Sequence, residues 1–263
     1  MDKDLAKILE EANAKRRAKQ QETSECMDQT GQQATQVAGK DAEYQNSIFG
    51  IQEQKTDYEK AKFLRDLAFH GIDKRFQNVT VFSIEHRLPG NENIRRNWSA
   101  VKGYISNIER HIEQGEGLIL AGSYGTMKTT MSVAVLRHWL SKDKGGGYLV
   151  PMATMIDNLY SMRMADREEA ARYENRLRTT PLLVIDDLGA ENTAQDWILS
   201  KTDSIITERY NKMKATIITT NQKPRDLENT YGGRIIDRIK SSCFYLEFNG
   251  ASERKPLNLE DII

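Results

Sequence analysis

Gly122-Ser-Tyr-Gly-Thr-Met-Lys-Thr-Thr130 is the stretch of sequence that decides the fold. It follows an apolar run at 117–121, which predicts a short buried strand, and precedes residues 131–140, which predict a helix. Strand, glycine-bearing turn and helix in this order form a phosphate cradle, because the turn's N–H groups and the positive end of the helix face one point. The stretch matches the pattern G-x-x-x-x-G-K-[ST] except at Met127, where glycine is expected.

The whole loop is a candidate site for ATP, with Mg²⁺ beside it. Lys128 would place its ammonium on the β- and γ-phosphates, and the Thr129 hydroxyl would ligate the metal. The candidate nucleotide-binding residues are Gly122, Ser123, Tyr124, Gly125, Thr126, Met127, Lys128, Thr129 and Thr130. The alternative interpretation is an ordinary turn followed by a Lys-Thr-Thr helix start.

Length and composition narrow the class of protein. The chain of 263 residues can hold one large domain, or one domain with a small appendage. Its 38 basic and 38 acidic residues balance, so any nucleic-acid surface must be local. Cys26 and Cys243 lie too far apart in the sequence for a zinc pair, and two cysteines make no disulfide framework. Without a long apolar run or a signal peptide, we expect a soluble cytoplasmic protein and no membrane contact.

The N-terminal part differs in composition from the rest. Residues 1–22 predict a short amphipathic helix, with Leu5, Ile8 and Leu9 on one stripe. Residues 23–57 are rich in Gln, Thr and Gly and predict a flexible linker. A tethered helix that cannot bury its own stripe suits partner docking, although it could also fold back on its domain.

Residues 58–263 predict one α/β domain. Short apolar strands at 117–121, 148–152, 181–186, 215–221 and 243–248 alternate with helices, which predicts a parallel sheet covered on both faces. Ahead of the sheet, residues 71–82 suggest a connector into a short β-rich piece, and residues 98–114 predict one helix.

Polar residues follow two of these strands. Asp186 and Asp187 end one strand, and Asn221 ends the next. Ligands bind at the carboxyl ends of parallel strands, so Asp186 would hold Mg²⁺ and Asp187 would orient and deprotonate the attacking water. The side-chain amide of Asn221 would face the γ-phosphate. The alternatives are an acidic turn after the first strand and a turn-forming asparagine after the second.

Three arginines complete the candidate site. Arg234 and Arg238 lie four positions apart and share a helix face. An arginine that reaches a neighbouring subunit's γ-phosphate would offset developing charge, whereas a surface pair partly neutralised by Asp237 is the alternative. Arg254 follows the last strand and could reach back to the phosphates.

Taken together, these motifs resemble the DnaC/DnaI-type helicase loaders, in the initiator and loader branch of AAA+ ATPases that also holds the IstB transposition helpers. The similarity covers residues 68–256. It is carried by residues 71–76, the Gly122–Thr130 loop, and residues 183–189, 218–221, 234–238 and 250–254.

The resemblance implies specific roles. It makes Asn221 sensor 1, Arg238 the arginine finger and Arg254 sensor 2, with Arg234 the lesser candidate for the finger. It also implies an AAA+ core with a minimal or absent lid, ATP-dependent assembly into a ring or spiral, and a hexameric replicative helicase of the DnaB type as partner. Met127, and Asp187 where the family commonly has Glu, suggest slow hydrolysis that depends on self-association and DNA.

Loaders of this branch carry an extra helical element that lines a pore for single-stranded DNA, and residues 155–178 occupy that position. Guanidinium groups and aromatic rings suit sequence-tolerant binding of single strands. Tyr173, Arg176 and Arg178 belong to the same pattern, although interspersed acidic residues would also fit a solvated helix pair. The candidate DNA-binding residues are Tyr160, Arg163, Arg167 and Arg172.

The N-terminal part departs from the DnaI type, because it has no zinc ligands. The favoured function is loading of a replicative helicase onto DNA by an ATPase. An IstB-like transposition helper that binds duplex DNA and a transposase is the runner-up. An ATP-binding adaptor that hydrolyses little is the third possibility.

Overall fold

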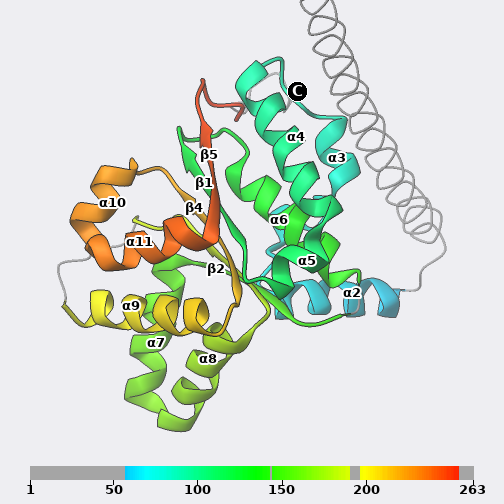
Figure 1. Ribbon diagram of the computed structural model, residues 1–263. Coiled ribbons are helices and arrows are strands. Elements are labelled where there is room, and N and C mark those ends of the chain that lie inside the picture. The colour runs from blue at the N-terminus through cyan, green and yellow to red at the C-terminus, as the bar shows by residue number, and fades with distance from the viewer. Residues whose placement is uncertain (1–56, 143, 190–195, 255–263) are drawn as a thin grey trace, which may run out of the picture.

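The computed structural model describes residues 57–142, 144–189 and 196–254. The predicted helix at 1–22 and all but the last residue of the predicted linker lie outside these ranges. At the centre is a parallel sheet of five strands in the order β2-β3-β4-β1-β5 (Figure 1). The strands are β1 (Gly117–Gly122), β2 (Gly147–Pro151), β3 (Leu182–Asp186), β4 (Ala215–Thr220) and β5 (Cys243–Phe248).

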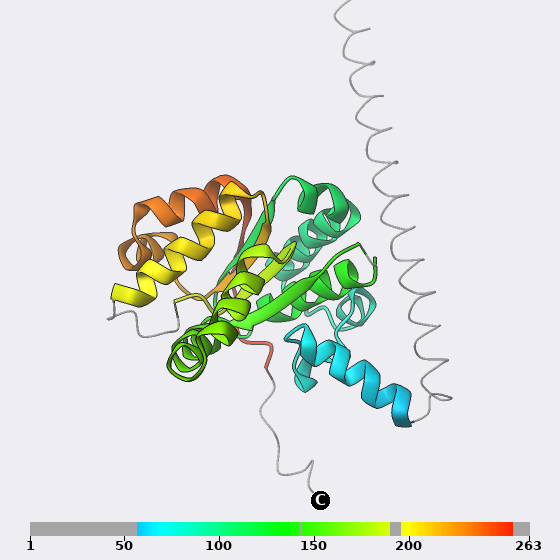
Figure 2. The ribbon, with the colours of Figure 1, turned by 90° about the horizontal axis from the view of Figure 1, so that it is seen from below.

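Helices cover both faces of the sheet (Figures 1 and 2). Leu118 and Leu120 of β1 pack with one helical layer, whereas Ile119 and Ala121 pack with the other. This alternation explains why the strands read as unbroken apolar runs, since both sides are buried. The first layer holds α2 (Asp57–Phe69), α3 (Val81–Glu85), α4 (Glu92–Ser106), α5 (Ile108–Glu113) and α6 (Lys128–Leu140). The second holds α7 (Met152–Ala165), α8 (Arg167–Thr179), α9 (Asp196–Asn211), α10 (Pro224–Tyr231) and α11 (Gly233–Ser242).

The predicted β-rich piece near residue 80 was wrong. A 3-10 turn, η1 (Lys74–Phe76), leads instead into α3. Thr80 and Ser83 exchange backbone and side-chain hydrogen bonds at the start of α3, at 2.8 and 3.1 Å. This capping arrangement satisfies free N–H groups of the first turn, and it outweighs the strand preference of the β-branched residues around it.

The single helix predicted over 98–114 is in fact two. The first, α4, begins earlier, at Glu92, because the Asn91 side chain caps it by accepting a hydrogen bond from the Ile94 N–H at 3.2 Å. It ends at Ser106, and α5 begins at Ile108. Asn91 and the residues that follow it also bring α4 against the outer strand β5.

Both outer strands of the sheet carry hydrogen bonds on their free edges. At β2, the Leu149 N–H donates to the His70 carbonyl at 2.9 Å, and His70 Nδ1 lies 2.7 Å from the Gly147 carbonyl oxygen. Gly71 makes this approach possible, because a Cβ there would stand 1.8 Å from the Leu149 oxygen. At β5, asparagine side chains of α4 bond to the backbone.

Among the helices of the described ranges, none combines the length and the apolar character needed to span a bilayer.

Candidate nucleotide-binding site

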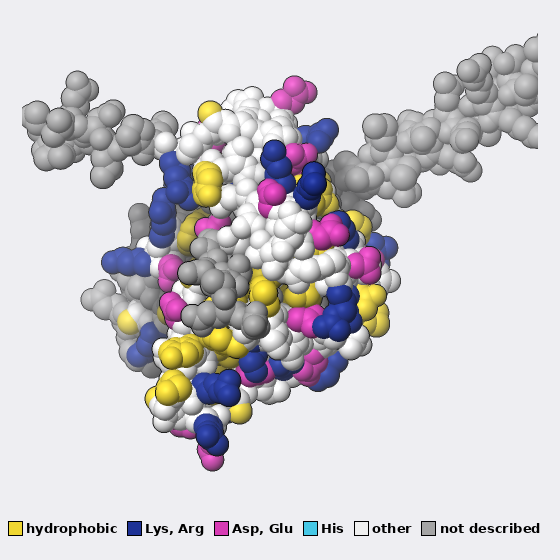
Figure 3. All heavy atoms as spheres, turned by 90° about the vertical axis from the view of Figure 1, so that its left-hand side faces the viewer, with side chains coloured by type: hydrophobic (Ala, Val, Ile, Leu, Met, Phe, Trp, Pro, Cys, Tyr) yellow, Lys and Arg dark blue, Asp and Glu magenta, His cyan; other side chains and the backbone are white. Residues whose placement is uncertain are grey.

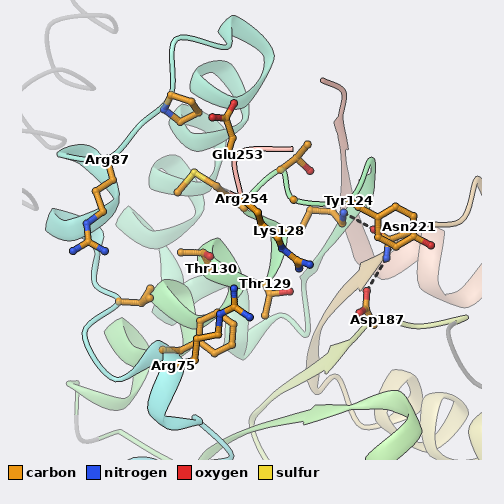
Figure 4. Close-up of a pocket in the computed structure, with 16 residues that line it drawn as sticks. Arg75, Arg87, Tyr124, Lys128, Thr129, Thr130, Asp187, Asn221, Glu253 and Arg254 are labelled. Atoms are coloured by element: carbon orange, nitrogen blue, oxygen red, sulfur yellow. Dashed lines mark hydrogen bonds between the residues drawn. The ribbon is translucent and has the colours of Figure 1, made fainter. Parts of the chain in front are cut away.

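The Gly122–Thr130 loop connects β1 to α6 and forms one wall of a cavity of about 750 Å³ (Figure 4). The cavity lies at the carboxyl ends of the strands, where a parallel sheet binds its ligands. Its other walls come from the η1–α4 region, the ends of β3 and β4, and the chain after β5. The lining residues are Arg75, Phe76, Val79, Arg87, Pro89, residues 124–130, Asp187, Asn221, Glu253 and Arg254.

The loop has the backbone shape of a phosphate cradle despite the methionine. Met127 adopts the left-handed conformation, with φ 69° and ψ 12°, directly before α6. Glycine takes this conformation most easily, which explains the glycine in the usual pattern. No side chain caps the first turn of α6, so its N–H groups remain available to an anion. Met127 therefore has, at the glycine position of the pattern, the backbone conformation that glycine favours.

Lys128 lies at the centre of the cavity and is buried. Its ammonium donates to the Gly122 and Ser123 carbonyls at 2.9 and 2.7 Å, and to Asn221 Oδ1 at 2.7 Å. Burial lowers the pKa of Lys128, and the nearby carboxylates of Asp187 and Asp186 oppose that effect. The phosphates of a nucleotide would add further negative charge beside this buried ammonium.

The predicted metal ligands contact each other. Asp186 Oδ1, at the end of β3, accepts hydrogen bonds from the hydroxyls of Thr129 at 2.8 Å and Thr219 at 2.5 Å. Burial raises the pKa of the Asp186 carboxyl, whereas the two hydroxyl donors lower it. A carboxylate beside a hydroxyl is an oxygen donor set of the kind that Mg²⁺ prefers, so these residues fit the metal.

Thr219 was missed by the sequence reasoning. Its hydroxyl also accepts a hydrogen bond from the Asp187 N–H at 2.9 Å. It therefore holds the Asp186 carboxylate and the backbone of Asp187 at the end of β3. The signal was available, because Thr219 and Thr220 are polar residues at the carboxyl end of a largely apolar strand.

Asn221 connects the lysine to the candidate base. Its Oδ1 accepts from Lys128, and its Nδ2 donates to Asp187 Oδ1 at 2.8 Å (Figure 4). Asp187 has φ 57°, which turns the chain sharply at the end of β3 and directs the side chain toward Asn221. The structure thus brings together three of the predicted site residues in one hydrogen-bonded chain.

Arginines line the cavity as well. Arg254, predicted from the sequence, reaches the cavity because Glu253 N–H donates to the Gly125 carbonyl at 3.0 Å and holds the chain there. The positive charge of Arg254 contributes to the lowered pKa of Lys128. Arg75 and Arg87 were not predicted. Figure 4 shows Arg75 below Thr129 and Arg87 at the end of the cavity away from Asp187.

Arg238 and Arg234 do not line the cavity. Both belong to α11 and pair with Asp203 of α9, with Arg238 Nη1 at 3.4 Å from Asp203 Oδ1. Asp203 lies within a helix and has no local pattern that would have singled it out. A role for Arg238 in hydrolysis therefore requires a second subunit.

The predicted DNA element is the hairpin of α7 and α8, which extends from the body of the protein at the lower end of Figure 1. Apolar and basic side chains lie next to each other on this end in Figure 3. Tyr160 is 56% exposed, and its ring lies 5.9 Å from that of Trp197. Within the described residues, Arg163 and Arg167 have no ion-pair partner, and Arg172 pairs with Glu168 at 3.4 Å.

Other members of the predicted DNA pattern have structural roles. Tyr173 is buried. Arg176 stacks between the rings of Phe69 and Tyr148, with its guanidinium carbon 4.3 and 4.0 Å from their centroids. Arg178 pairs with carboxylates of α8 and α9. These three side chains hold α8 to the rest of the domain.

A five-stranded parallel sheet of this order, with a glycine-bearing loop after β1 and two aspartates at the end of β3, has the fold of the AAA+ P-loop ATPases. The family described as IstB-like ATP binding protein matches residues 104–260. The chain therefore belongs to the IstB-like ATP-binding family.

Individual relatives are replication proteins. The chain is 24% identical over 156 residues to the replicative helicase loader DnaI of Bacillus subtilis (strain 168), covering 54% of this chain and 49% of DnaI. It thus spans about half the length of that relative.

Solved structures agree on the fold. The crystal structure of the DnaC helicase loader superposes with a TM-score of 0.60 at 28% identity, covering 67% of this chain and all (100%) of that chain. The replication initiator DnaA bound to AMPPCP and single-stranded DNA superposes with a TM-score of 0.54 at 15% identity, covering 68% of this chain and 51% of DnaA. At that identity, DnaA supports the fold alone.

Proposed function

We propose that this protein is an ATPase that loads a hexameric replicative helicase onto single-stranded DNA. The observation that carries the ATPase part is the hydrogen-bonded chain from Lys128 through Asn221 to Asp187, in a cavity that Arg254 also lines. Phosphate binding, water positioning and charge stabilisation need these groups within reach of one another.

Each group has a distinct task in ATP hydrolysis. The loop N–H groups and Lys128 bind the β- and γ-phosphates. Thr129 and Asp186 would hold Mg²⁺, which would supply positive charge beside the phosphates when bound. Asp187 accepts the proton of the attacking water, and Asn221 orients that water against the γ-phosphate. Arg254 stabilises the charge that develops on the transferred group.

The remaining catalytic group comes from a neighbouring subunit in this proposal. Arg238 lies outside its own cavity, which is what a finger acting on the next subunit requires. Hydrolysis would then be slow in the isolated protein and faster after self-association into a ring or spiral. An arginine supplied by a partner accelerates such reactions by roughly 10³- to 10⁵-fold in other systems.

The relatives support the helicase part of the proposal, and the α7–α8 hairpin supports the DNA part. The similarity to DnaI and DnaC supports a DnaB-type helicase as the partner. The exposed Tyr160, Arg163 and Arg167 support contact with single-stranded DNA, because stacking and phosphate contacts are independent of sequence.

The proposal is tested with a replicative helicase in a pull-down and a loading assay on single-stranded DNA. We compare full-length protein, a form lacking residues 1–22, and Lys128→Ala. We expect ATP-dependent loading by the full-length protein, loss of helicase binding on truncation, and loss of loading but retained docking for Lys128→Ala. No helicase binding by any form would refute the loader function. Tight ATP binding with no turnover in the assembled state would indicate an adaptor.

A second function is favoured by the family match, because that family is named for IstB. In this alternative the protein binds duplex DNA and a transposase. Equal binding of duplex and single-stranded DNA, together with capture of a transposase but not of a helicase, would support it.

A further inference from the structure

Three asparagines at the start of α4 hold the end of β5. Asn93 Nδ2 and Asn97 Nδ2 donate to the Glu247 carbonyl at 3.0 and 2.7 Å. Asn93 Oδ1 accepts from the Asn249 N–H at 2.9 Å, and Asn91 Nδ2 donates to the Asn249 carbonyl at 3.1 Å. We call these side chains the asparagine clasp.

The Asn93 side chain makes the hydrogen bonds that a neighbouring strand would otherwise make with the end of β5. Phe248 directs its carbonyl toward β1, where it accepts from the Ser123 N–H at 2.9 Å. Successive residues of a strand direct their backbone groups to opposite sides, so Glu247 and Asn249 face outward. The Asn93 amide has one donor and one acceptor side, and it satisfies the outward carbonyl and the outward N–H together.

The chain after the clasp enters the nucleotide cavity along a fixed path. Gly250 has φ 143°, and a Cβ there would stand 2.1 Å from Asn91 Nδ2. Two residues later, Ser252 packs against the phosphate loop, where a Cβ on Gly125 would stand 2.0 Å from its Oγ. The Glu253 N–H donates to the Gly125 carbonyl at 3.0 Å. The segment 249–253 is therefore held by α4 at one end and by the phosphate loop at the other.

We propose that Asn93 is a positioning residue for Arg254, acting through this segment; the inference rests on the proposed ATPase function. Asn93 is not one of the residues that line the cavity. Without its amide, the Asn249 N–H loses its protein partner and the Glu247 carbonyl keeps only Asn97, so the start of the segment is held less firmly. Arg254 then samples positions away from the phosphates. Asn97 bonds to the same carbonyl but leaves the Asn249 N–H untouched, so Asn93 makes the contact that fixes the segment.

The first test is a double-mutant cycle on the affinity for a fluorescent, non-hydrolysable ATP analogue. Because a hydrogen bond to a charged group is worth about 1.5–3 kcal/mol, Arg254→Ala should weaken binding roughly 10- to 100-fold. Asn93→Ala should weaken it by about 3- to 10-fold in the native background and leave it unchanged in the Arg254→Ala background. Asn107→Ala is the matched control, because Asn107 follows the other end of α4, is exposed, and bonds only within that turn.

An equal loss in both backgrounds would mean that Asn93 acts through general stability and would overturn the inference. The second test needs no nucleotide. Hydrogen exchange of the peptide covering residues 247–254 should accelerate in Asn93→Ala and stay unchanged in Asn107→Ala. Unchanged exchange in both overturns the inference. Absence of analogue binding by the native protein would instead refute the ATPase function, and exchange would then decide alone whether Asn93 anchors the segment.

Discussion

Replacing Met127 separates the backbone requirement of the phosphate loop from the chemistry of the side chain. Met127 has φ 69°, and its half-buried side chain packs against the core on the α2–α6 side of the sheet. We consider Met127→Gly and Met127→Ala together. Both remove the packing of the side chain, but only glycine relieves the left-handed conformation.

The magnitudes follow from these two effects. Loss of a half-buried methionine costs about 1 kcal/mol of the free energy of unfolding. A non-glycine residue in the left-handed region destabilises the folded state by about 1–2 kcal/mol. Glycine removes this strain, but the greater freedom of its unfolded chain destabilises the fold by roughly 0.5–1 kcal/mol and offsets part of the gain. We therefore expect Met127→Ala to destabilise by about 1 kcal/mol and Met127→Gly to be more stable than Met127→Ala by roughly 0.5–1 kcal/mol.

Urea unfolding followed by circular dichroism measures both free energies in matched conditions. If Met127→Gly is no more stable than Met127→Ala, the left-handed backbone is not a cost at this position and the reasoning fails. ATP affinity provides the second measurement. Since Met127 already has the left-handed backbone conformation that glycine favours, we expect Met127→Gly to bind ATP with an affinity within about threefold of the native protein. If ATP turnover in the assembled state does not rise, the methionine is not what limits hydrolysis.

Three further predictions concern other parts of the domain. Arg75→Ala should weaken ATP binding by about 10-fold, measured by titration with a fluorescent analogue, if the guanidinium at the cavity contacts phosphate; an unchanged affinity would exclude that contact. Arg209→Met should lower the free energy of unfolding by about 3–5 kcal/mol, because the buried guanidinium donates to three carbonyls, two at the end of α8 and one in β4; the exposed Lys212→Ala is the control, and equal effects would contradict the argument. The double change Arg163→Ser and Arg167→Ser should reduce the slope of single-strand affinity against salt by about 1.4, since each phosphate contact contributes about 0.7; an unchanged slope would remove the hairpin from the DNA site.

The sequence was most informative where local chemistry and strand order coincide. The loop, the two aspartates and Asn221 each follow a strand, and a parallel sheet places all strand ends at one edge. Their proximity in the structure follows from that rule, and so does the position of Lys128 among them. Successive side chains of β1 are all buried, in alternate helical layers, which is why unbroken apolar runs correctly predicted a sheet covered on both faces.

Predictions failed where side-chain hydrogen bonds decide the local structure. The reciprocal bonds of Thr80 and Ser83 make a helix from residues that favour strands. The stacking of Arg176 on Phe69 and Tyr148 depends on segments far apart in sequence, and no local pattern reveals it. The same holds for Arg75 and Arg87, whose place in the cavity depends on how the η1–α4 region packs beside the phosphate loop.

The hydrogen bonds at the two outer strands have a consequence for how copies of this protein can meet. An open strand edge invites another chain to continue the sheet, which is a common route to aggregation and to strand exchange. Here His70 occupies groups on the edge of β2, and the asparagine clasp occupies groups on the edge of β5. Fewer backbone groups at these edges are therefore open to a neighbouring copy. Contacts through side chains and helices would let the subunits of a ring or spiral separate again without breaking a shared sheet.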